Sequence, residues 1–242
     1  MSAKYDTIGL NYAELRRPDE RIARIIHSAL GPAQTVLNVG VGTGSYEPAD
    51  RSVTAVEPSR EMIRKRKTAA AKAIQASAEA LPFDDGSFEA SMAILTIHHW
   101  PDKQAGLREM RRVTRGTIVL LTFDPAHRPW LTDYLPELAA LDEKQMPTMD
   151  DYERWLGPVQ ITPVLVPHDC SDGFLYAYWR RPAAYLDARL RSGSSSFWAI
   201  GSAEAGLQTL RRDLESGAWQ RRHAELLSLD AYDAGYRLVV AA

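Results

Sequence analysis

The sequence contains little cysteine and lacks long apolar runs. Cys170 is the only cysteine among 242 residues, so no disulfide can form within the chain. Such cysteine usage is typical of a reducing compartment. No stretch reaches the roughly 20 apolar residues that a membrane-spanning helix requires, and residues 1–17 hold no apolar core of a secretion signal. We therefore expect a cytoplasmic protein with no membrane partner.

An excess of positive charge is also lacking. The 29 lysines and arginines are balanced by 31 aspartates and glutamates, which gives a formal net charge of −2. This balance provides no electrostatic basis for binding nucleic acid, and the basic run at residues 64–67 is typical of the solvated face of a helix. The apolar content of 45% is ordinary for a globular protein, and the length suits one domain spanning residues 1–242.

Residues 35–39 form a short apolar run that is followed by Gly40, Gly42 and Gly44. Such a run predicts a buried strand of a parallel sheet, and the glycines predict a tight turn that a ligand can approach closely. A second apolar run ends in Glu57, 17 positions after Gly40 (57 − 40). This is near the spacing of roughly 20 at which an acid meets a ribose diol in dinucleotide-binding folds. The stretch therefore predicts a nucleoside site at the C-terminal edge of an α/β sheet.

Apolar runs and helical patterns alternate along the first half of the chain. Asp19 predicts the start of a helix that stops at residues 31–32, and Gly116 predicts the end of a later helix. The alternation indicates a doubly wound, mostly parallel sheet with right-handed crossovers. The predicted helices cover residues 19–30, 58–67 and 101–116, and the predicted strands cover residues 34–39, 53–57, 73–76, 88–97, 117–123, 159–166 and 235–240.

The regular alternation ends near residue 125. The segment that follows contains several prolines, and Pro163 predicts that its strand lies at an edge of the sheet. Residues 173–230 have a mainly helical pattern, with leucines in register on one face. We therefore expect a cofactor-binding core at about residues 19–124 and a final strand at residues 235–241. Between them, at about residues 125–230, we expect a region that binds the second substrate (the acceptor) or covers the site as a cap.

Two further segments follow the glycine stretch in order: residues 76–90, with the sequence ASAEALPFDDGSFEA, and residues 94–100, with the sequence ILTIHHW. Together with residues 35–44 and the helical residues 107–113, they resemble class I S-adenosylmethionine-dependent methyltransferases, in particular the small-molecule "type 11" group. That group includes ubiquinone and menaquinone methyltransferases and the carboxyl methyltransferases of trans-aconitate and juvenile hormone acid. The resemblance covers residues 34–123. It implies a Rossmann-like α/β fold with a seven-stranded sheet and a helical cap inserted before the last strand.

The resemblance implies S-adenosylmethionine as cofactor and S-adenosylhomocysteine as product. Glu57 would hold the ribose hydroxyls, although an acid in this place could otherwise only cap the next helix. Ser77 stands where the family usually has an acid for the adenine amino group, and Asn38 replaces the usual acid of the first motif. The residues implied in cofactor binding are Tyr12, Arg16, Asn38, Gly40, Gly42, Thr43, Gly44, Glu57, Pro58, Met62, Ser77, Ala78, Glu79 and Ala93.

Methyl transfer from a sulfonium is an in-line displacement, so positioning and the exclusion of water are its main requirements. A carboxylate acceptor needs no base, whereas a phenol, an amine or a carbon acid needs one within about 3 Å. His98 and His99 follow the fourth predicted strand, Asp124 ends the fifth, and His168 lies in the polar loop at residues 167–173. These four residues are the candidate catalytic residues, and each could instead make only structural contacts. No metal site is expected.

We expect a methyltransferase that acts on a small organic acceptor, first at a carboxylate or phenolic oxygen, with nitrogen or carbon as the alternative. The many aromatic side chains of the C-terminal half suit a planar or apolar acceptor. Two other classes stay open. One is an NAD-dependent oxidoreductase, although Ser45 stands where the dinucleotide fingerprint requires glycine. The other is a non-catalytic nucleoside-binding module.

Overall fold

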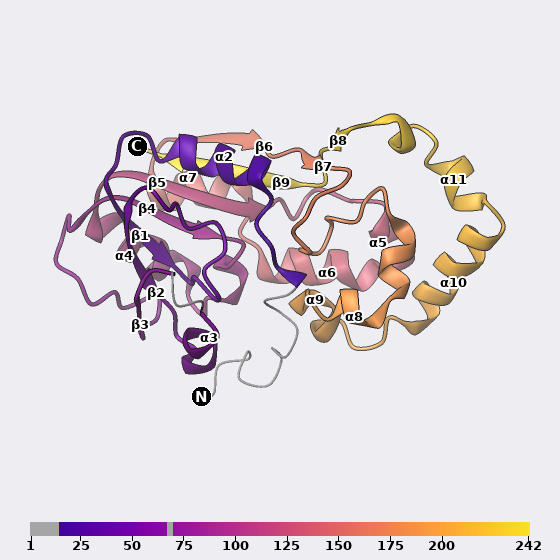
Figure 1. Cartoon of the computed structure of the whole chain (residues 1–242), viewed down its shortest axis with the longest axis horizontal. Helices are drawn as coiled ribbons and strands as arrows, with labels where there is room; N and C mark the ends of the chain where they lie inside the picture. The colour runs from indigo at the N-terminus through magenta and orange to yellow at the C-terminus, as the bar shows by residue number, and fades with distance from the viewer. Residues whose placement is uncertain (1–14, 67–69) are drawn as a thin grey trace.

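A seven-stranded sheet forms the centre of the computed structural model, which describes residues 15–66 and 70–242 (Figure 1). All strands run parallel except β9, which lies antiparallel to both of its neighbours. The prediction of a mostly parallel α/β sheet is therefore confirmed. In spatial order the strands are β3 (Ala73–Ile74), β2 (Ser52–Val56), β1 (Thr35–Val39), β4 (Phe88–Ile94), β5 (Thr114–Phe123), β9 (Tyr236–Ala241) and β6 (Val159–Pro163).

Strands β1 and β2 end level with each other, which positions the segments that follow them. Their register runs from Thr35 opposite Ser52 to Val39 opposite Val56. The backbone N–H of Gly40 then donates to the carbonyl of Val56 at 2.8 Å. Parallel strands present their carboxyl ends at one edge of the sheet, so the turn after β1 meets the acid after β2.

Helices cover both faces of the sheet. On one face, α2 (Glu20–Ala29) buries Ile22 and Ile26 in the same cluster as Val119 and Leu121 of β5. On the opposite face, α4 (Lys103–Val113) and α7 (Met149–Leu156) pack in a second cluster with the alternate residues of β5. Successive strand side chains point to opposite faces, which is why neighbouring apolar residues of one strand belong to different clusters.

The helical region lies beside the sheet, at the right of Figure 1. Its first helices come between β5 and β6, and the others are inserted between β6 and the last strand, as expected for a cap. The two-residue strands β7 (Val166–Pro167) and β8 (Ala231–Tyr232) pair at its base. Its helices are α5 (Leu131–Tyr134), α6 (Pro136–Gln145), α8 (Ala188–Arg191), α9 (Ser195–Ala199), α10 (Glu204–Glu215) and α11 (Ala218–Arg222), with the 3-10 turns η3 (Pro182–Leu186) and η4 (Leu226–Ser228).

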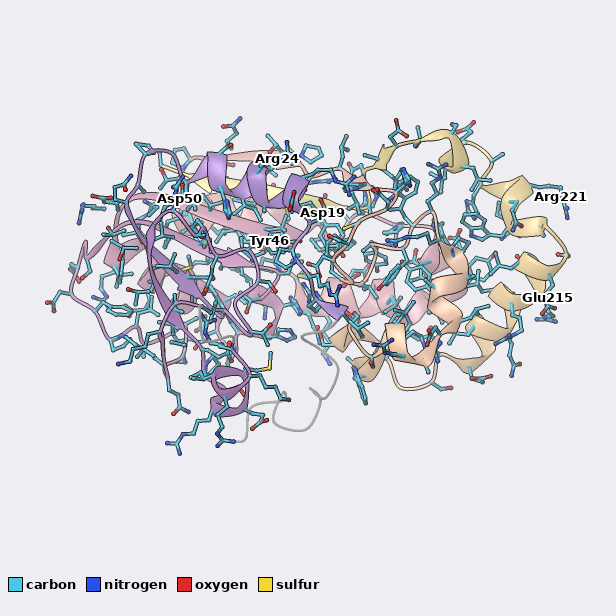
Figure 2. All side chains as sticks on the ribbon, in the orientation of Figure 1. Asp19, Arg24, Tyr46, Asp50, Glu215 and Arg221 are labelled. Carbon is cyan, nitrogen blue, oxygen red and sulfur yellow. The ribbon has the colours of Figure 1, made fainter. Side chains whose placement is uncertain are left out.

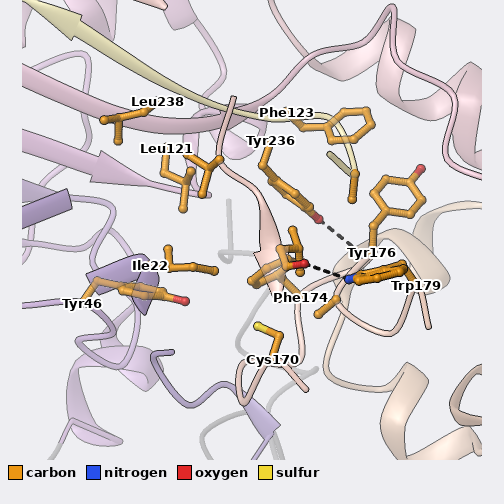
Figure 3. Packing of buried hydrophobic residues seen from close by; sticks show 14 of the residues in the cluster. Ile22, Tyr46, Leu121, Phe123, Cys170, Phe174, Tyr176, Trp179, Tyr236 and Leu238 are labelled. Atoms are coloured by element: carbon orange, nitrogen blue, oxygen red, sulfur yellow. Dashed lines mark hydrogen bonds between the residues drawn. The ribbon is translucent and has the colours of Figure 1, made fainter. Parts of the chain in front are cut away.

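One hydrophobic cluster continues from the sheet into this region. It includes Ile22 of α2 and Leu121 of β5, and it extends to Tyr176 and Trp179 in the helical region (Figure 3). Trp130 donates its indole N–H to the carbonyl of Trp179 at 2.8 Å within the same cluster. Burial of such large aromatic side chains across both parts holds the helical region against the sheet.

The structure corrects several predicted boundaries. Helix α4 ends at Val113 and β5 follows directly, so Gly116 lies inside the strand and does not end the helix. A Cβ at Gly116 would lie 2.4 Å from the carbonyl oxygen of Glu89, so close strand packing explains this glycine. Strand β4 ends at Ile94, and the 3-10 turn η2 (Ile97–His99) replaces its predicted last residues. Helix α3 (Arg60–Arg64) is shorter than predicted.

The regular alternation of strands and helices ends after β5, as predicted, but residues 125–158 contain three helices, α5, α6 and α7, that the sequence pattern did not indicate. Pro136 begins α6, a position where its missing N–H costs no hydrogen bond. Thr148 and Asp151 form a reciprocal capping box that starts α7. The prediction that β6 lies at an edge is confirmed.

Candidate active site

A cavity of about 550 Å³ opens where β1, β2 and β4 end. Open α/β sheets bind ligands at this edge, and the volume lies within the range of about 300–1,000 Å³ typical of small-molecule sites. Its walls come from segments that the sheet topology brings together. They comprise Arg16, Asn38, Gly40, Val41, Gly42, Thr43, Ser45, Tyr46, Glu57, Pro58, Met62, Ser77, Ala78, Glu79, Ile94, Leu95, Thr96, His98, His99, Trp100, Pro101, Gln145, Ser195, Trp198 and Ala199.

The turn after β1 requires glycine at Gly40 for two reasons. Its φ of 70° lies in the left-handed region, and a Cβ there would sit 2.2 Å from Oγ1 of Thr96. Gly42 also has a positive φ, of 54°. The chain thus turns with its backbone against the segment after β4, and the backbone of the turn forms one wall of the cavity.

Glu57 is held by two backbone N–H groups. Its Oε2 accepts from Gly42 at 2.8 Å and its Oε1 accepts from Ser59 at 2.9 Å. The side chain is only 6% exposed and lines the cavity. It therefore holds Ser59, the N-cap residue of α3, and also presents a carboxylate to the cavity, so the two interpretations of this acid do not exclude each other. Carboxylate oxygens have further lone pairs that can accept from ligand hydroxyls.

Asn38 gives an observation that bears on the cofactor. Its Nδ2 is buried and has no hydrogen-bond partner in the part of the chain that the structure describes, although the residue lines the cavity. A buried donor of this kind needs a partner, and a carboxylate such as that of the methionine portion of S-adenosylmethionine would supply one. The Glu57 carboxylate lines the same cavity and can accept from hydroxyls, so the residues present fit this cofactor. Asn38 would then donate a hydrogen bond to the carboxylate of the cofactor. The acid that the family usually has at this position would instead accept from the ammonium group of the cofactor.

The segment around Ser77, Ala78 and Glu79 forms the wall nearest to α4. Two side chains of α4 hold the chain just beyond it. Glu109 accepts from the N–H of Leu81 at 2.9 Å, and Arg112 donates to the carbonyl of Leu81 at 3.0 Å. The Arg112 guanidinium lowers the pKa of Glu109, so this pair stays ionised. Helix α4 therefore fixes the geometry of the cavity wall without lining the cavity.

A buried network joins the helical region to the turn after β1. The Asp172 carboxylate, which is fully buried, accepts from Nε of Arg16 at 2.7 Å and from the Tyr46 hydroxyl at 2.9 Å. Tyr46 lies close to Asp19 at the start of α2 (Figure 2). Burial raises the pKa of Tyr46 well above its usual range, so the tyrosine remains a neutral donor. Arg16 and Tyr46 line the cavity, whereas Tyr12 lies outside the described residues.

His98 and His99 also line the cavity, and their ring centroids are 3.8 Å apart. They follow Leu95, which comes directly after β4 and has a positive φ of 52°. A non-glycine residue in this region is uncommon and is often found at functional sites. Across the cavity, α9 contributes Ser195 and Trp198, and Trp198 is 55% exposed at the rim.

A narrower space of about 50 Å³ adjoins the main cavity and shares Arg16, Leu95, His98, His99 and Ser195 with it. It also contains an acid that the sequence pattern did not indicate as a site residue. Asp142 of α6 lines this space, and burial raises the pKa of its carboxyl to about 6. The hydroxyl of Tyr176 donates to Asp142 at 2.8 Å. The one available signal was that Asp142 follows the buried Leu138 by four positions and so shares its helix face.

Among the predicted site residues that the structure describes, four do not line the cavity. Gly44 packs toward Arg66 and Glu47, and Ala93 is fully buried within β4. The carboxylate of Asp124 accepts from the N–H of Ala126 at 3.0 Å and pairs with Arg237. His168 follows β7, where its N–H donates to the carbonyl of Asp230.

The loop that contains His168 also contains Cys170, which is buried. Burial raises the pKa of the Cys170 thiol to about 12, so this thiol stays protonated near neutral pH. Among residues 15–66 and 70–242, no group of three or more histidine, cysteine, aspartate or glutamate side chains is placed to bind a metal ion. No helix in the same described ranges is long and apolar enough to cross a membrane.

Comparisons with known proteins identify the family of the chain. The family model described as "Methyltransferase domain" matches residues 37–120. A crystal structure from Anabaena variabilis, named "Putative methyltransferase from antibiotic biosynthesis pathway", is 37% identical with a TM-score of 0.86, and the match covers 94% of this chain and 99% of that one.

Curated proteins match over shorter stretches. A ubiquinone/menaquinone biosynthesis C-methyltransferase from Geobacter is 34% identical over 43% of this chain and 52% of its own length. A demethylmenaquinone methyltransferase from Renibacterium salmoninarum is 33% identical over 55% of this chain and 60% of its own length. The chain thus spans little more than half the length of these relatives. From the near-complete match to the Anabaena structure, together with the family model, we conclude that the chain belongs to the class I S-adenosylmethionine-dependent methyltransferases of the type 11 group.

Proposed function

We propose that the protein transfers a methyl group from S-adenosylmethionine to a small organic acceptor, and that the acceptor atom is oxygen. The proposal rests on the cavity wall formed by the Gly40 turn, the Glu57 carboxylate and the side chain of Asn38, whose Nδ2 has no hydrogen-bond partner among the described residues. These three features match the needs of a nucleoside with an attached amino acid: close backbone approach, an acceptor for a diol, and a donor for a carboxylate.

The main cavity and the narrow space beside it would bind different ligands. The sheet edge would bind the cofactor, and the adjoining narrow space, with its aromatic walls, would receive the acceptor. Bound S-adenosylmethionine supplies an activated methyl group, so the chain's own residues need to orient the acceptor and exclude water. His98 and His99 line both spaces and are placed to contact either ligand. The shared hydrophobic cluster supports treating residues 1–242 as one functional domain.

The names of the relatives support a small acceptor but differ on its atom. Among the matched proteins are quinone-pathway C-methyltransferases and, in Erwinia pyrifoliae, a malonyl-[acyl-carrier protein] O-methyltransferase that is 35% identical over 43% of this chain. We favour oxygen because the acceptor space holds a buried carboxylate that can take a hydroxyl proton. Carbon and nitrogen acceptors are the alternatives.

The test is a transfer assay with methyl-labelled S-adenosylmethionine and fractionated metabolite extracts, followed by mass analysis of labelled products. We expect a small product that is heavier than its precursor by one CH₂ and bears the label on oxygen. A product labelled on carbon or nitrogen would refute the choice of oxygen. Absence of transfer to every fraction by folded protein, together with turnover of NAD, would instead support an oxidoreductase.

A further inference from the structure

The narrow space beside the main cavity has an unusual combination of walls. Four aromatic side chains line it, and one carboxylate, that of Asp142, faces the same space. The rings pack closely, with centroids 5.0 Å apart for Phe123 and Tyr176 and 4.6 Å apart for Phe174 and Tyr236 (Figure 3). Such walls favour a planar apolar ligand, and the volume of about 50 Å³ admits only the end of such a molecule.

Asp142 is buried, and only one of its two carboxylate oxygens has a hydrogen-bond partner among the described residues. The residue is 5% exposed, and its Oδ2 accepts a hydrogen bond of 2.8 Å from the hydroxyl of Tyr176. Its Oδ1 makes no hydrogen bond to the residues that the structure describes. A buried carboxylate with an open lone pair gains from a ligand that donates a hydrogen bond to it.

The charges around Asp142 narrow the choice of ligand. The titratable or charged groups near it are Tyr176 and Arg128, and those on the shared walls are Arg16, His98, His99 and Tyr236. Arg128 also pairs with the neighbouring Glu143, and Arg16 pairs with Asp172. A carboxylate acceptor would place two anions in one buried space, which is costly. A neutral hydroxyl avoids this repulsion and can donate a hydrogen bond to Asp142, so it fits this space.

We propose that Asp142 binds the hydroxyl group of an aromatic acceptor and takes its proton during methyl transfer, which makes the acceptor a phenol. This proposal rests on the function proposed above. In the step, the phenolic oxygen forms a bond to the methyl carbon while the bond between that carbon and the sulfonium sulfur breaks, and sulfur keeps the electron pair. The phenolic O–H bond breaks as well, and its proton moves to Oδ1 of Asp142.

Tyr176 is a positioning residue in this account. Its hydrogen bond fixes Oδ2, which leaves Oδ1 turned to the ligand, and the same bond lowers the pKa of Asp142 against the effect of burial. Loss of the tyrosine hydroxyl therefore predicts a carboxyl that ionises at higher pH. A purely structural role of Tyr176 would not shift this pH dependence.

The experiment measures binding of small aromatic probes by calorimetry to protein saturated with S-adenosylhomocysteine. The probes are phenol and 2-naphthol, their carboxylate counterparts benzoate and 2-naphthoate, and benzylamine. We expect the hydroxyl probes to bind best, with an affinity that rises several-fold as the pH passes through about 6. Asp142→Asn should weaken their binding at least tenfold and abolish the pH dependence, and Tyr176→Phe should shift its midpoint upward. Asp230→Asn, at an exposed site, is the matched control.

Each other outcome has a defined meaning. If S-adenosylhomocysteine binds but no hydroxyl probe does, or if benzoates or benzylamine bind better than phenols, the phenol assignment is wrong and the proposed function survives. The same holds if Asp142→Asn leaves phenol binding and its pH dependence unchanged. Should Asp142→Asn fail to fold, the pH midpoint of Tyr176→Phe decides, and an unshifted midpoint would overturn the role of Asp142. If S-adenosylhomocysteine itself does not bind, the proposed function fails first.

Discussion

The carboxylate of Glu57 accepts a hydrogen bond of 2.8 Å from the backbone N–H of Gly42. This bond joins the turn after β1 to the end of β2, so the two segments form one wall of the cavity. Because the bond uses one oxygen of Glu57 and Ser59 occupies the other, the acid is fixed before any ligand arrives. A fixed acceptor costs little ordering when a ribose diol binds.

Replacement of Glu57 by glutamine tests this arrangement. The amide keeps one acceptor oxygen but turns an NH₂ group toward the second backbone N–H, and it removes the negative charge. Hydrogen bonds to charged groups contribute roughly 1.5–3 kcal/mol, so we expect affinity for S-adenosylhomocysteine to fall about tenfold or more. Calorimetric titration measures the change. Glu61→Gln, on the exposed side of α3, should leave the affinity unaltered. Equal affinity of the wild type and Glu57→Gln would show that the ribose lies elsewhere.

Gly40→Ala should destabilise the fold far more than Gly31→Ala. Both glycines have a positive φ, but a Cβ at Gly40 meets Thr96 at 2.2 Å, whereas nothing lies within 4 Å of one at Gly31. Left-handed backbone alone costs an alanine about 1–2 kcal/mol, and the clash adds roughly 1–3 kcal/mol. Urea unfolding measures both variants. Similar losses in the two would contradict the close packing of the turn against Thr96.

Asp172→Asn should lower the free energy of unfolding by about 3 kcal/mol, because it leaves the Arg16 cation, whose side chain is 11% exposed, without its full counter-charge. Tyr46→Phe removes one hydrogen bond from the same network and should cost about 1 kcal/mol. Removal of the exposed pair between Glu61 and Arg64 should cost about 0.5 kcal/mol or less. Urea unfolding at low and high salt distinguishes them, since only the exposed pair should respond to salt. A loss at Asp172 no larger than at the exposed pair would argue against a buried network.

Asp142 should make the fold less stable as the pH rises. Burial raises its pKa from the usual 3.8 to about 6, so the folded protein binds this proton more tightly than the unfolded chain does. The stabilisation is complete below pH 4 and is lost as the pH passes through about 6. Asp142→Asn removes this linkage. Its stability relative to wild type should therefore increase by about 2 kcal/mol between pH 4.5 and pH 7.5 in urea unfolding. A difference that stays constant with pH would mean that Asp142 is ionised as freely as a surface acid.

The sequence predicted well those features that depend on neighbouring segments. The Gly40 turn and Glu57 come together because β1 and β2 are adjacent parallel strands, and such pairing follows from the local pattern of apolar runs. The family resemblance identified the segments around Ser77 and His98, which also reach the cavity wall. The roles of these residues in binding remain predictions.

Contacts between residues that are far apart in the sequence could not be predicted. Asp172 meets Arg16 across 156 positions, and Asp142 meets Tyr176 across 34. Asp142 shares a helix face with Leu138, but no local pattern points to Asp172, and both acids meet their partners only in the tertiary fold. Gly116 was misread for a related reason, since its requirement comes from the Glu89 carbonyl on the neighbouring strand and not from the helix before it.

We propose that the turn after β1 and the acid after β2 bind one adenosine between them. The decisive experiment is calorimetric titration of the wild-type protein with S-adenosylhomocysteine and, separately, with NAD, with the melting temperature as a second readout. We expect S-adenosylhomocysteine to bind one to one and to stabilise the fold by about 2.7 kcal/mol at 100 times its dissociation constant, while NAD does neither. Binding of NAD without binding of S-adenosylhomocysteine, or binding of neither, would contradict the claim.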